Sequence, residues 1–137
     1  MYDLAALESV LAGTVYDGKV HFVSTTGSTN QDAMSAARNG APHGSVFFAD
    51  EQTAGRGRGG HHWHSAAGDG LYVSALVTPP IPVTMAMLLP LAAGLTAQSA
   101  ILEVAGLDAD IRCPNDLLLN GRKCGGILVE TAASAGQ

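Results

Sequence analysis

The spacing of apolar residues in the first half of the chain predicts helices and strands in alternation. Residues 3–12 carry apolar side chains at helical intervals, which predicts a short amphipathic helix with Leu4, Leu7, Val10 and Leu11 on one side. Residues 20–24 predict a strand. Helix formers follow up to Arg38, and Asn39-Gly40 supplies a stop signal. At the start of this helix, Ser28 with Gln31, or Thr29 with Asp32, has the spacing of a capping box.

The second half of the chain continues the mixture. Residues 45–49 and 71–77 are apolar and rich in strand formers, which predicts two strands. Residues 116–119 and 122–130 flank Asn120-Gly121, a strong signal for a two-residue hairpin turn. One face of a long helix is traced by Met85, Leu88, Leu89, Ala92, Leu95, Ser99 and Leu102. Together these elements predict an α/β (α+β) fold, a mixed β-sheet flanked by helices.

The stretch from Gly70 to Leu102 contains no charged residue, which is also compatible with a membrane span. Polar residues dot its helical part, and prolines interrupt it at positions 79, 80, 82 and 90. We therefore expect a buried core helix and no membrane partner.

Composition narrows the class of protein. At 137 residues, 47% hydrophobic and 14% charged, the chain predicts a single domain over residues 1–137 with one core and little disorder. A net charge of −5 argues against a nucleic-acid partner. Cys113 and Cys124 are interpreted as small core residues of a reduced, cytoplasmic protein. The amino terminus, with Asp3 and Glu8, does not look like a signal peptide.

The segment Ala54-Gly55-Arg56-Gly57-Arg58-Gly59-Gly60 is the first candidate for chemistry. Its glycines allow backbone N–H groups to approach an anion, and its two arginines suit a carboxylate or a phosphate. The spacing matches G-x-G-x-x-G, but no apolar helix follows, so a dinucleotide site is not indicated. A flexible surface loop explains the glycines equally well.

The predicted hairpin is the second candidate. Its turn would pair Leu118 with Lys123 and Asp116 with Gly125, so that Asp116 and Lys123 lie within reach of each other or of one ligand. Taken by itself, a surface ion pair is the more common explanation of such a pattern.

Histidines and a tryptophan follow the glycine-rich segment. His61, His62 and His64 lack the carboxylate or cysteine pattern that would complete a metal site, so none is predicted. Trp63 fits either ordinary packing or stacking on a purine.

Four short sequence motifs, taken in their order along the chain, indicate a protein family. The segments Ser28-Thr29-Asn30, Glu51 to Gly60 with Trp63, Pro114-Asn115-Asp116 and Gly121 to Glu130 resemble, in the same order, the S-T-N, Q-T-x-G-R-G-R-x-G, W-P-N-D and R-K-x-x-G-I-L-V-E motifs of biotin–protein ligases. The resemblance runs from about Thr25 to Glu130.

This resemblance implies an ATP-dependent enzyme that forms biotinyl-5′-AMP and transfers biotin to a lysine of a biotin carboxyl carrier protein, which belongs to a biotin-dependent carboxylase. The implied biotin site consists of Ser28, Thr29, Asn30, Gln52, Arg56, Gly57, Arg58, Lys123 and Gly126. The implied nucleotide site consists of Arg56, Arg58, Trp63, Arg112, Asn115, Asp116 and Lys123. Lys123 and Arg58 would be catalytic, with Mg²⁺ assisting ATP and without a protein metal site.

The chain also departs from the family pattern. Cys113 stands where the family usually has Trp, and Arg112 where it prefers Lys. The family continues into further strands and a small carboxy-terminal β domain, so we expect a truncated copy or a fragment. We expect no DNA-binding segment before the domain, and therefore no role as a DNA-binding repressor. A lipoate–protein ligase and an inactive remnant that binds biotin or the adenylate remain alternatives, and a homodimer is possible.

Overall fold

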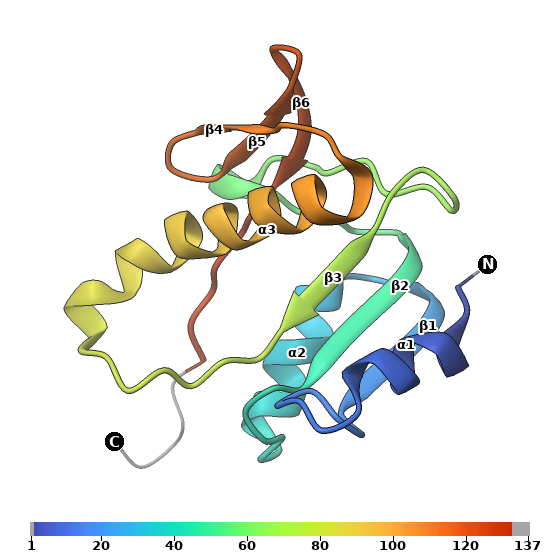
Figure 1. Ribbon diagram of the computed structural model, residues 1–137. Helices are drawn as coiled ribbons and strands as arrows, with labels where there is room; N and C mark the ends of the chain where they lie inside the picture. Colours follow the sequence, from blue (N-terminus) through green and yellow to red (C-terminus); the bar gives the residue numbers. More distant parts are fainter. Residues whose placement is uncertain (1, 133–137) are drawn as a thin grey trace. The chain divides into compact units, whose positions relative to one another are not determined.

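The computed structural model describes residues 2–132 (Figure 1). It divides the chain into two compact units, the first built on residues 2–79 and 130–132 and the second on Pro80–Val129. Each unit has its own small sheet, and each is described by itself below.

The first unit is built on a mixed sheet with the strand order β1-β2-β3. β1 and β2 run parallel, in a register that pairs Phe22 with Phe48. β3 runs antiparallel to β2 and pairs Ser74 with Phe47. The predicted mixed sheet is therefore confirmed. Its strands are β1 (Val20–Thr26), β2 (Val46–Gln52) and β3 (Tyr72–Ala75).

Two helices cover this sheet: α1 (Leu4–Leu11) and α2 (Thr29–Arg38). Adjacent residues of a strand point to opposite faces, so Phe48 and Phe47 define the two sides of β2. On the Phe48 side, the rings of Phe22 and Phe48 lie 4.9 Å apart beside α1. On the other side, Thr29 of α2 reaches Ser74 of β3. The middle of the sheet is thereby buried, with Phe48 and Ala49 4% and 0% exposed, whereas Val23 and Val73 on the outer strands are about half exposed.

The start of α2 differs from the prediction. Ser28 is the N-cap residue and has extended backbone angles, but its hydroxyl makes no capping hydrogen bond. The Asp32 carboxylate accepts a hydrogen bond from Thr26 Oγ1 at 2.7 Å instead of closing a capping box. The capping-box prediction is therefore wrong, because Ser28 makes no cap hydrogen bond and the Asp32 carboxylate is bonded to Thr26. The predicted stop is confirmed, with Asn39 as C-cap and Gly40 at φ +84°.

The second unit contains an antiparallel sheet with the strand order β4-β5-β6, formed by β4 (Asp110–Arg112), β5 (Asp116–Leu119) and β6 (Arg122–Gly126). The predicted turn is confirmed, since Asn120 and Gly121 have φ values of 51° and 75°. The sequence pattern did not predict β4, which is very short. β6 ends at Gly126, whereas the pattern predicted a strand as far as residue 130.

The predicted register of the hairpin is correct next to the turn but is off by one residue farther from it. Leu118 pairs with Lys123 as predicted, but Asp116 pairs with Gly126 and not with Gly125. An irregularity next to Leu117 inserts one extra residue in β6. The predicted pairing of Asp116 with Gly125 is therefore wrong by one residue.

The apolar segment forms a 3₁₀ helix, η2 (Val83–Leu88), followed by α3 (Leu89–Ala105). The predicted inward face is wrong, because Leu88, Leu95 and Leu102 are 49%, 51% and 52% exposed. α3 packs through another stripe, in which the buried Gly94 faces Ile111 and Ile127. The packed stripe contains Gly94 and Gln98, so its hydrophobic pattern is weaker than that of the exposed stripe, and periodicity indicated the wrong face.

The expectation of a buried core helix is likewise not met. Val83–Ala105 spans 23 residues and includes an 18-residue stretch with a mean hydropathy of 1.6, of which 6% is buried. By length and composition alone, this helical stretch could cross a membrane.

Candidate functional site

Thr29 and Gln52 form the centre of a polar network in the first unit. The Thr29 N–H donates to Gln52 Oε1 at 2.9 Å, and Thr29 Oγ1 lies 3.1 Å from the same oxygen. Gln52 Nε2 donates to Ser65 Oγ at 3.0 Å, and the Ser65 hydroxyl donates to the Trp63 carbonyl at 3.1 Å. The start of α2 and the end of β2 thus bring together two residues that the sequence assigned to the biotin site.

Ser74 extends this network and was missed by the sequence analysis. Its hydroxyl lies 2.8 Å from Thr29 Oγ1 and donates to Asn30 Oδ1. Ser74 is 8% exposed and shares a face of β3 with the buried Tyr72. A serine at an inward strand position must find a polar partner, and this signal was available in the sequence.

Ser28 lies directly before these residues and is 3% exposed. Because its hydroxyl does not cap α2, it is not committed to the helix terminus. A buried hydroxyl beside a network of amide and hydroxyl groups can offer both a donor and an acceptor to a small polar ligand.

Glu130 is the second residue that the sequence analysis missed as part of the site. Its Oε2 accepts a hydrogen bond from Asn30 Nδ2 at 2.9 Å, and its Oε1 lies 3.8 Å from Arg56 Nη2. In the sequence Glu130 is only the last residue of a family motif, and no local pattern links it to Asn30, which is 100 positions away. It connects the polar network to the glycine- and arginine-rich segment.

That segment folds back on itself. Gly57 N–H donates to the His61 carbonyl at 2.7 Å, and Trp63 N–H donates to the Gly55 carbonyl at 2.8 Å. The turn between these two bonds is a short 3₁₀ helix, η1 (Arg58–Gly60), in which Gly59 and Gly60 have positive φ values. The backbone is therefore organised as a small hairpin, whereas an unstructured surface loop was the alternative left open by the sequence.

The position of Gly55 leaves no room for a side chain. A Cβ atom there would lie 2.6 Å from Ser65 Oγ, 2.7 Å from the Trp63 carbonyl and 3.1 Å from Gln52 Nε2. At Gly57, in contrast, the nearest atom would be 3.8 Å away. Gly55 thus allows the hairpin to lie directly against the polar network, while Arg56 and Arg58 are exposed beside it and Trp63 is half-buried.

The second unit brings two cations to one carboxylate. Lys123 Nζ lies 2.7 Å from Asp116 Oδ1, and Arg112 Nη2 lies 2.7 Å from Asp116 Oδ2. Hydrogen bonds from Lys123 first and Arg112 second lower the pKa of Asp116 below its usual value, while burial acts in the opposite direction. The predicted proximity of Asp116 and Lys123 is confirmed, and the cluster carries more positive than negative charge.

The backbone next to this cluster is held by the sheet, and two nearby cysteines differ from the prediction. The Asn115 carbonyl accepts a hydrogen bond from Ile127 N–H at 2.9 Å, and Gly126 lies opposite Asp116 in the sheet. Cys113 and Cys124 are free thiols and both are exposed, so their interpretation as core residues is wrong. Cys113 directly follows β4, and Cys124 lies in the middle of β6, where the register shifts.

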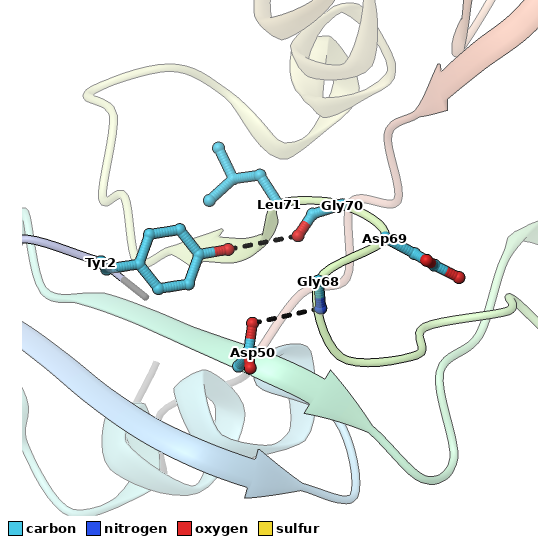
Figure 2. A pocket seen from close by; sticks show the side chains of 6 residues that line it. All are labelled: Tyr2, Asp50, Gly68, Asp69, Gly70 and Leu71. Atoms are coloured by element: carbon cyan, nitrogen blue, oxygen red, sulfur yellow. Dashed lines mark hydrogen bonds between the residues drawn. The ribbon is translucent and has the colours of Figure 1, made fainter.

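A separate pocket in the first unit is lined by Tyr2, Asp50 and residues 68–71 (Figure 2). Tyr2 Oη donates to the Gly70 carbonyl at 3.2 Å, and Gly68 N–H donates to Asp50 at 3.4 Å. None of the residues assigned from the sequence lines this pocket. Within residues 2–132, the structure contains no group of three His, Cys, Asp or Glu side chains arranged to hold a metal ion.

Comparison with known proteins assigns the family. The profile of the biotin/lipoate A/B protein ligase family matches residues 21–136. The chain belongs to this family. It is 44% identical over 106 residues to the bifunctional ligase/repressor BirA of Bacillus subtilis, covering 77% of this chain and 33% of that protein. It is 39% identical over 115 residues to the biotin–[acetyl-CoA-carboxylase] ligase of Mycobacterium tuberculosis, covering 80% and 43%.

Solved structures of family members have the same fold. The Leishmania major biotin protein ligase in complex with biotinyl-5-AMP superposes with a TM-score of 0.75 and 31% identity, over 85% of this chain and 53% of that one. The Aquifex aeolicus biotin protein ligase in complex with biotin and ATP gives a TM-score of 0.74 and 30% identity, over 84% and 47%. This biotin/lipoate ligase family chain therefore spans between a third and about half of the length of these relatives.

Proposed function

We propose that the chain carries the biotin-binding and adenylate-forming residues of a biotin–protein ligase. The observation that carries this proposal is the network of the buried Thr29 and Ser74 with the half-buried Gln52, next to Ser28. A cyclic urea such as that of biotin presents two N–H donors and one carbonyl acceptor, all of which must be paired when it is buried. Hydroxyl and amide groups at the end of a strand and the start of a helix match those needs.

The carboxylate end of biotin and the adenylate would be bound by the hairpin of residues 55–63. Arg56 and Arg58 supply charge-assisted donors, and the backbone at Gly57 allows close approach. Trp63 would offer a surface for the nucleotide base. Arg58, exposed on the η1 turn, would mainly slow escape of the adenylate.

The cluster of Lys123, Arg112 and Asp116 would assist the reaction of biotin with ATP. A carboxylate oxygen of biotin attacks the α-phosphorus of ATP, pyrophosphate leaves, and a lysine amine of the carrier then attacks the mixed anhydride and releases AMP. Lys123 would stabilise the negative charge that develops on the phosphoryl oxygens. Asp116, bonded to both cations, would hold them in place, and Asn115 and Gly126 lie next to it.

A resident magnesium site does not fit these residues. Both carboxylate oxygens of Asp116 are bonded to cationic side chains. The part of the chain that the structure describes has no other cluster of metal ligands. We therefore assign Mg²⁺ to the triphosphate, as part of the substrate, and not to the protein.

A biotin carboxyl carrier protein would be the acceptor, as the names of the ligase relatives suggest. The alternatives are a lipoate–protein ligase and an inactive protein that binds biotin or the adenylate. Lipoate has no urea and so offers no ring N–H donors to the amide and hydroxyl groups of the first unit, which favours biotin. A homodimer and a cytoplasmic location remain proposals based on the family resemblance and on the cysteine usage.

The proposal is tested by mixing the chain with biotin, ATP, Mg²⁺ and a carrier domain and measuring pyrophosphate release and biotin attached to the carrier. Release that depends on biotin supports an adenylating enzyme, and a biotinylated carrier supports the full ligase. Saturable biotin binding without pyrophosphate release would favour the inactive binder. Release that depends on lipoate would favour the lipoate enzyme.

A further inference from the structure

Ser65 holds the end of β2 at two points. The Gln52 backbone N–H donates to the Ser65 carbonyl at 3.0 Å, and Gln52 Nε2 donates to Ser65 Oγ at 3.0 Å. Ser65 is 3% exposed, so water has little access to its hydroxyl group. A hydrogen bond made by such a buried group is costly to leave unmade. Ser65 is therefore placed to control both the backbone and the side chain of Gln52.

The direction of the Gln52 amide follows from its contacts at both ends. The Thr29 backbone N–H can only donate, so the atom that it meets at 2.9 Å must be the amide oxygen Oε1. The Thr29 hydroxyl also donates to Oε1, at 3.1 Å. At the other end, Ser65 Oγ accepts from Nε2, because the Ser65 proton is donated to the Trp63 carbonyl. Thr29 and Ser65 thus hold the amide in one orientation.

The backbone at Gly55 encloses the bond between Gln52 and Ser65. A Cβ atom at Gly55 would lie 2.6 Å from Ser65 Oγ and 3.1 Å from Gln52 Nε2. Within residues 2–132, the structure gives Nε2 one acceptor, the Ser65 hydroxyl. Without this hydroxyl, the amide would be held only through its oxygen, and its NH₂ group would be free to turn.

We propose that Ser65 is a positioning residue, whose hydroxyl fixes the Gln52 amide in its binding orientation before a ligand arrives. This inference rests on the proposed function, because Gln52 is assigned to the biotin site. A side chain that is already fixed loses less conformational freedom when the ligand binds, which raises the affinity. Ser65 acts through Gln52 and need not touch the ligand.

The test removes the hydroxyl in two backgrounds. Ser65→Ala should lower the affinity for biotin about tenfold, because the Gln52 amide loses one of its two anchors. In Gln52→Leu, which has no amide to position, adding Ser65→Ala should change the affinity by less than about twofold. Equilibrium dialysis of the 137-residue chain with labelled biotin gives the four affinities. If the two losses simply add, or if Ser65→Ala binds like the wild type, the inference is wrong.

Ser45→Ala is the matched control. Ser45 is 1% exposed, and its hydroxyl donates to the Pro42 carbonyl at 2.8 Å directly before the other end of β2. Its removal deletes the same kind of buried bond from the same unit, so it should lower the unfolding temperature and leave the affinity for biotin unchanged. An affinity as low as that of Ser65→Ala would mean that general loosening of the fold, and not the orientation of Gln52, weakens binding.

A measurement on the free wild-type chain decides the question even if Ser65→Ala does not fold. By NMR, one of the two Gln52 Nε2 hydrogens should exchange with solvent more slowly than the other, because it is bonded to Ser65. Equally fast exchange of both hydrogens would overturn the inference. Absence of saturable biotin binding by the wild type would overturn the proposed function and this inference with it. Biotin binding without coupling between Ser65 and Gln52 would overturn the inference alone.

Discussion

Lys123 Nζ lies 2.7 Å from Asp116 Oδ1 across the β5–β6 hairpin. The ammonium group is held by a carboxylate that also binds Arg112, so its long side chain is fixed in one direction without an excess of negative charge. A fixed cation costs little reorganisation when negative charge develops on a substrate. This is the physical basis for assigning Lys123 to the phosphoryl chemistry.

Lys123→Ala should lower the rate of biotinyl-adenylate formation by about two to three orders of magnitude and leave the fold intact, because it removes a charge donor that acts in the transition state. Biotin-dependent pyrophosphate release is the measurement. Arg122→Ala is the control, since it removes a positive charge from the neighbouring residue of the same hairpin. Equal rates for Lys123→Ala and the wild type would remove Lys123 from the mechanism.

The lowered pKa of Asp116 predicts a pH-dependent part of the stability. A carboxyl group whose pKa is lower in the folded state stabilises the fold above its ordinary pKa of about 4, and this contribution disappears as the pH falls through the folded value. Urea unfolding should therefore show a smaller loss of stability between about pH 7 and pH 3 in Asp116→Asn than in the wild type. The difference should be modest, because Arg112 and Lys123 are 62% and 39% exposed. Asp110→Asn serves as control, and identical pH profiles for wild type and Asp116→Asn would contradict the assignment.

Gly55→Ala should destabilise the chain by about 1–3 kcal/mol, because the new methyl group would overlap Ser65 and the Trp63 carbonyl. Gly57→Ala has room and a negative φ of −109°, so its unfolding temperature should stay close to that of the wild type. Thermal unfolding of both variants checks this difference. A Gly55→Ala variant as stable as Gly57→Ala would mean that the hairpin does not lie against the polar network.

The exposed apolar face of α3 predicts self-association of the 137-residue chain. Leu95 and Leu102 lie seven residues apart on one face and are half exposed, and Val104 is 87% exposed. Leu95→Lys/Leu102→Lys should shift the mass measured by light scattering toward the monomer. Ala100→Lys adds a charge to the same helix without removing a large apolar side chain, and it should have less effect. An unchanged mass in the double variant would show that this face is not responsible.

Elements with a local signal were predictable from the sequence. The Asn120-Gly121 turn and the Asn39-Gly40 helix stop follow from backbone preferences of neighbouring residues. The contact between Lys123 and Asp116 was also predicted, because it depends mainly on the turn and survives the one-residue shift in β6.

The remaining parts depend on tertiary structure. The contacts of Ser74 and Glu130 with Asn30 join residues 44 and 100 positions apart, and no periodicity encodes them. The packed side of α3 could not be predicted either, because Gly94 gives no hydrophobic signal although it faces Ile111 and Ile127. The exposure of Cys113 and Cys124 depends on where the fold places them, which composition does not reveal.

The most direct test of the central claim is a calorimetric titration of the chain with biotin and, separately, with lipoate. The account predicts saturable binding of one biotin per chain, a loss of at least about tenfold in affinity for Thr29→Val and Gln52→Leu, and no measurable binding of lipoate, because only a cyclic urea offers both N–H donors and a carbonyl acceptor to these amide and hydroxyl groups. Binding of lipoate as tight as that of biotin, or biotin binding unaffected by both substitutions, would contradict it.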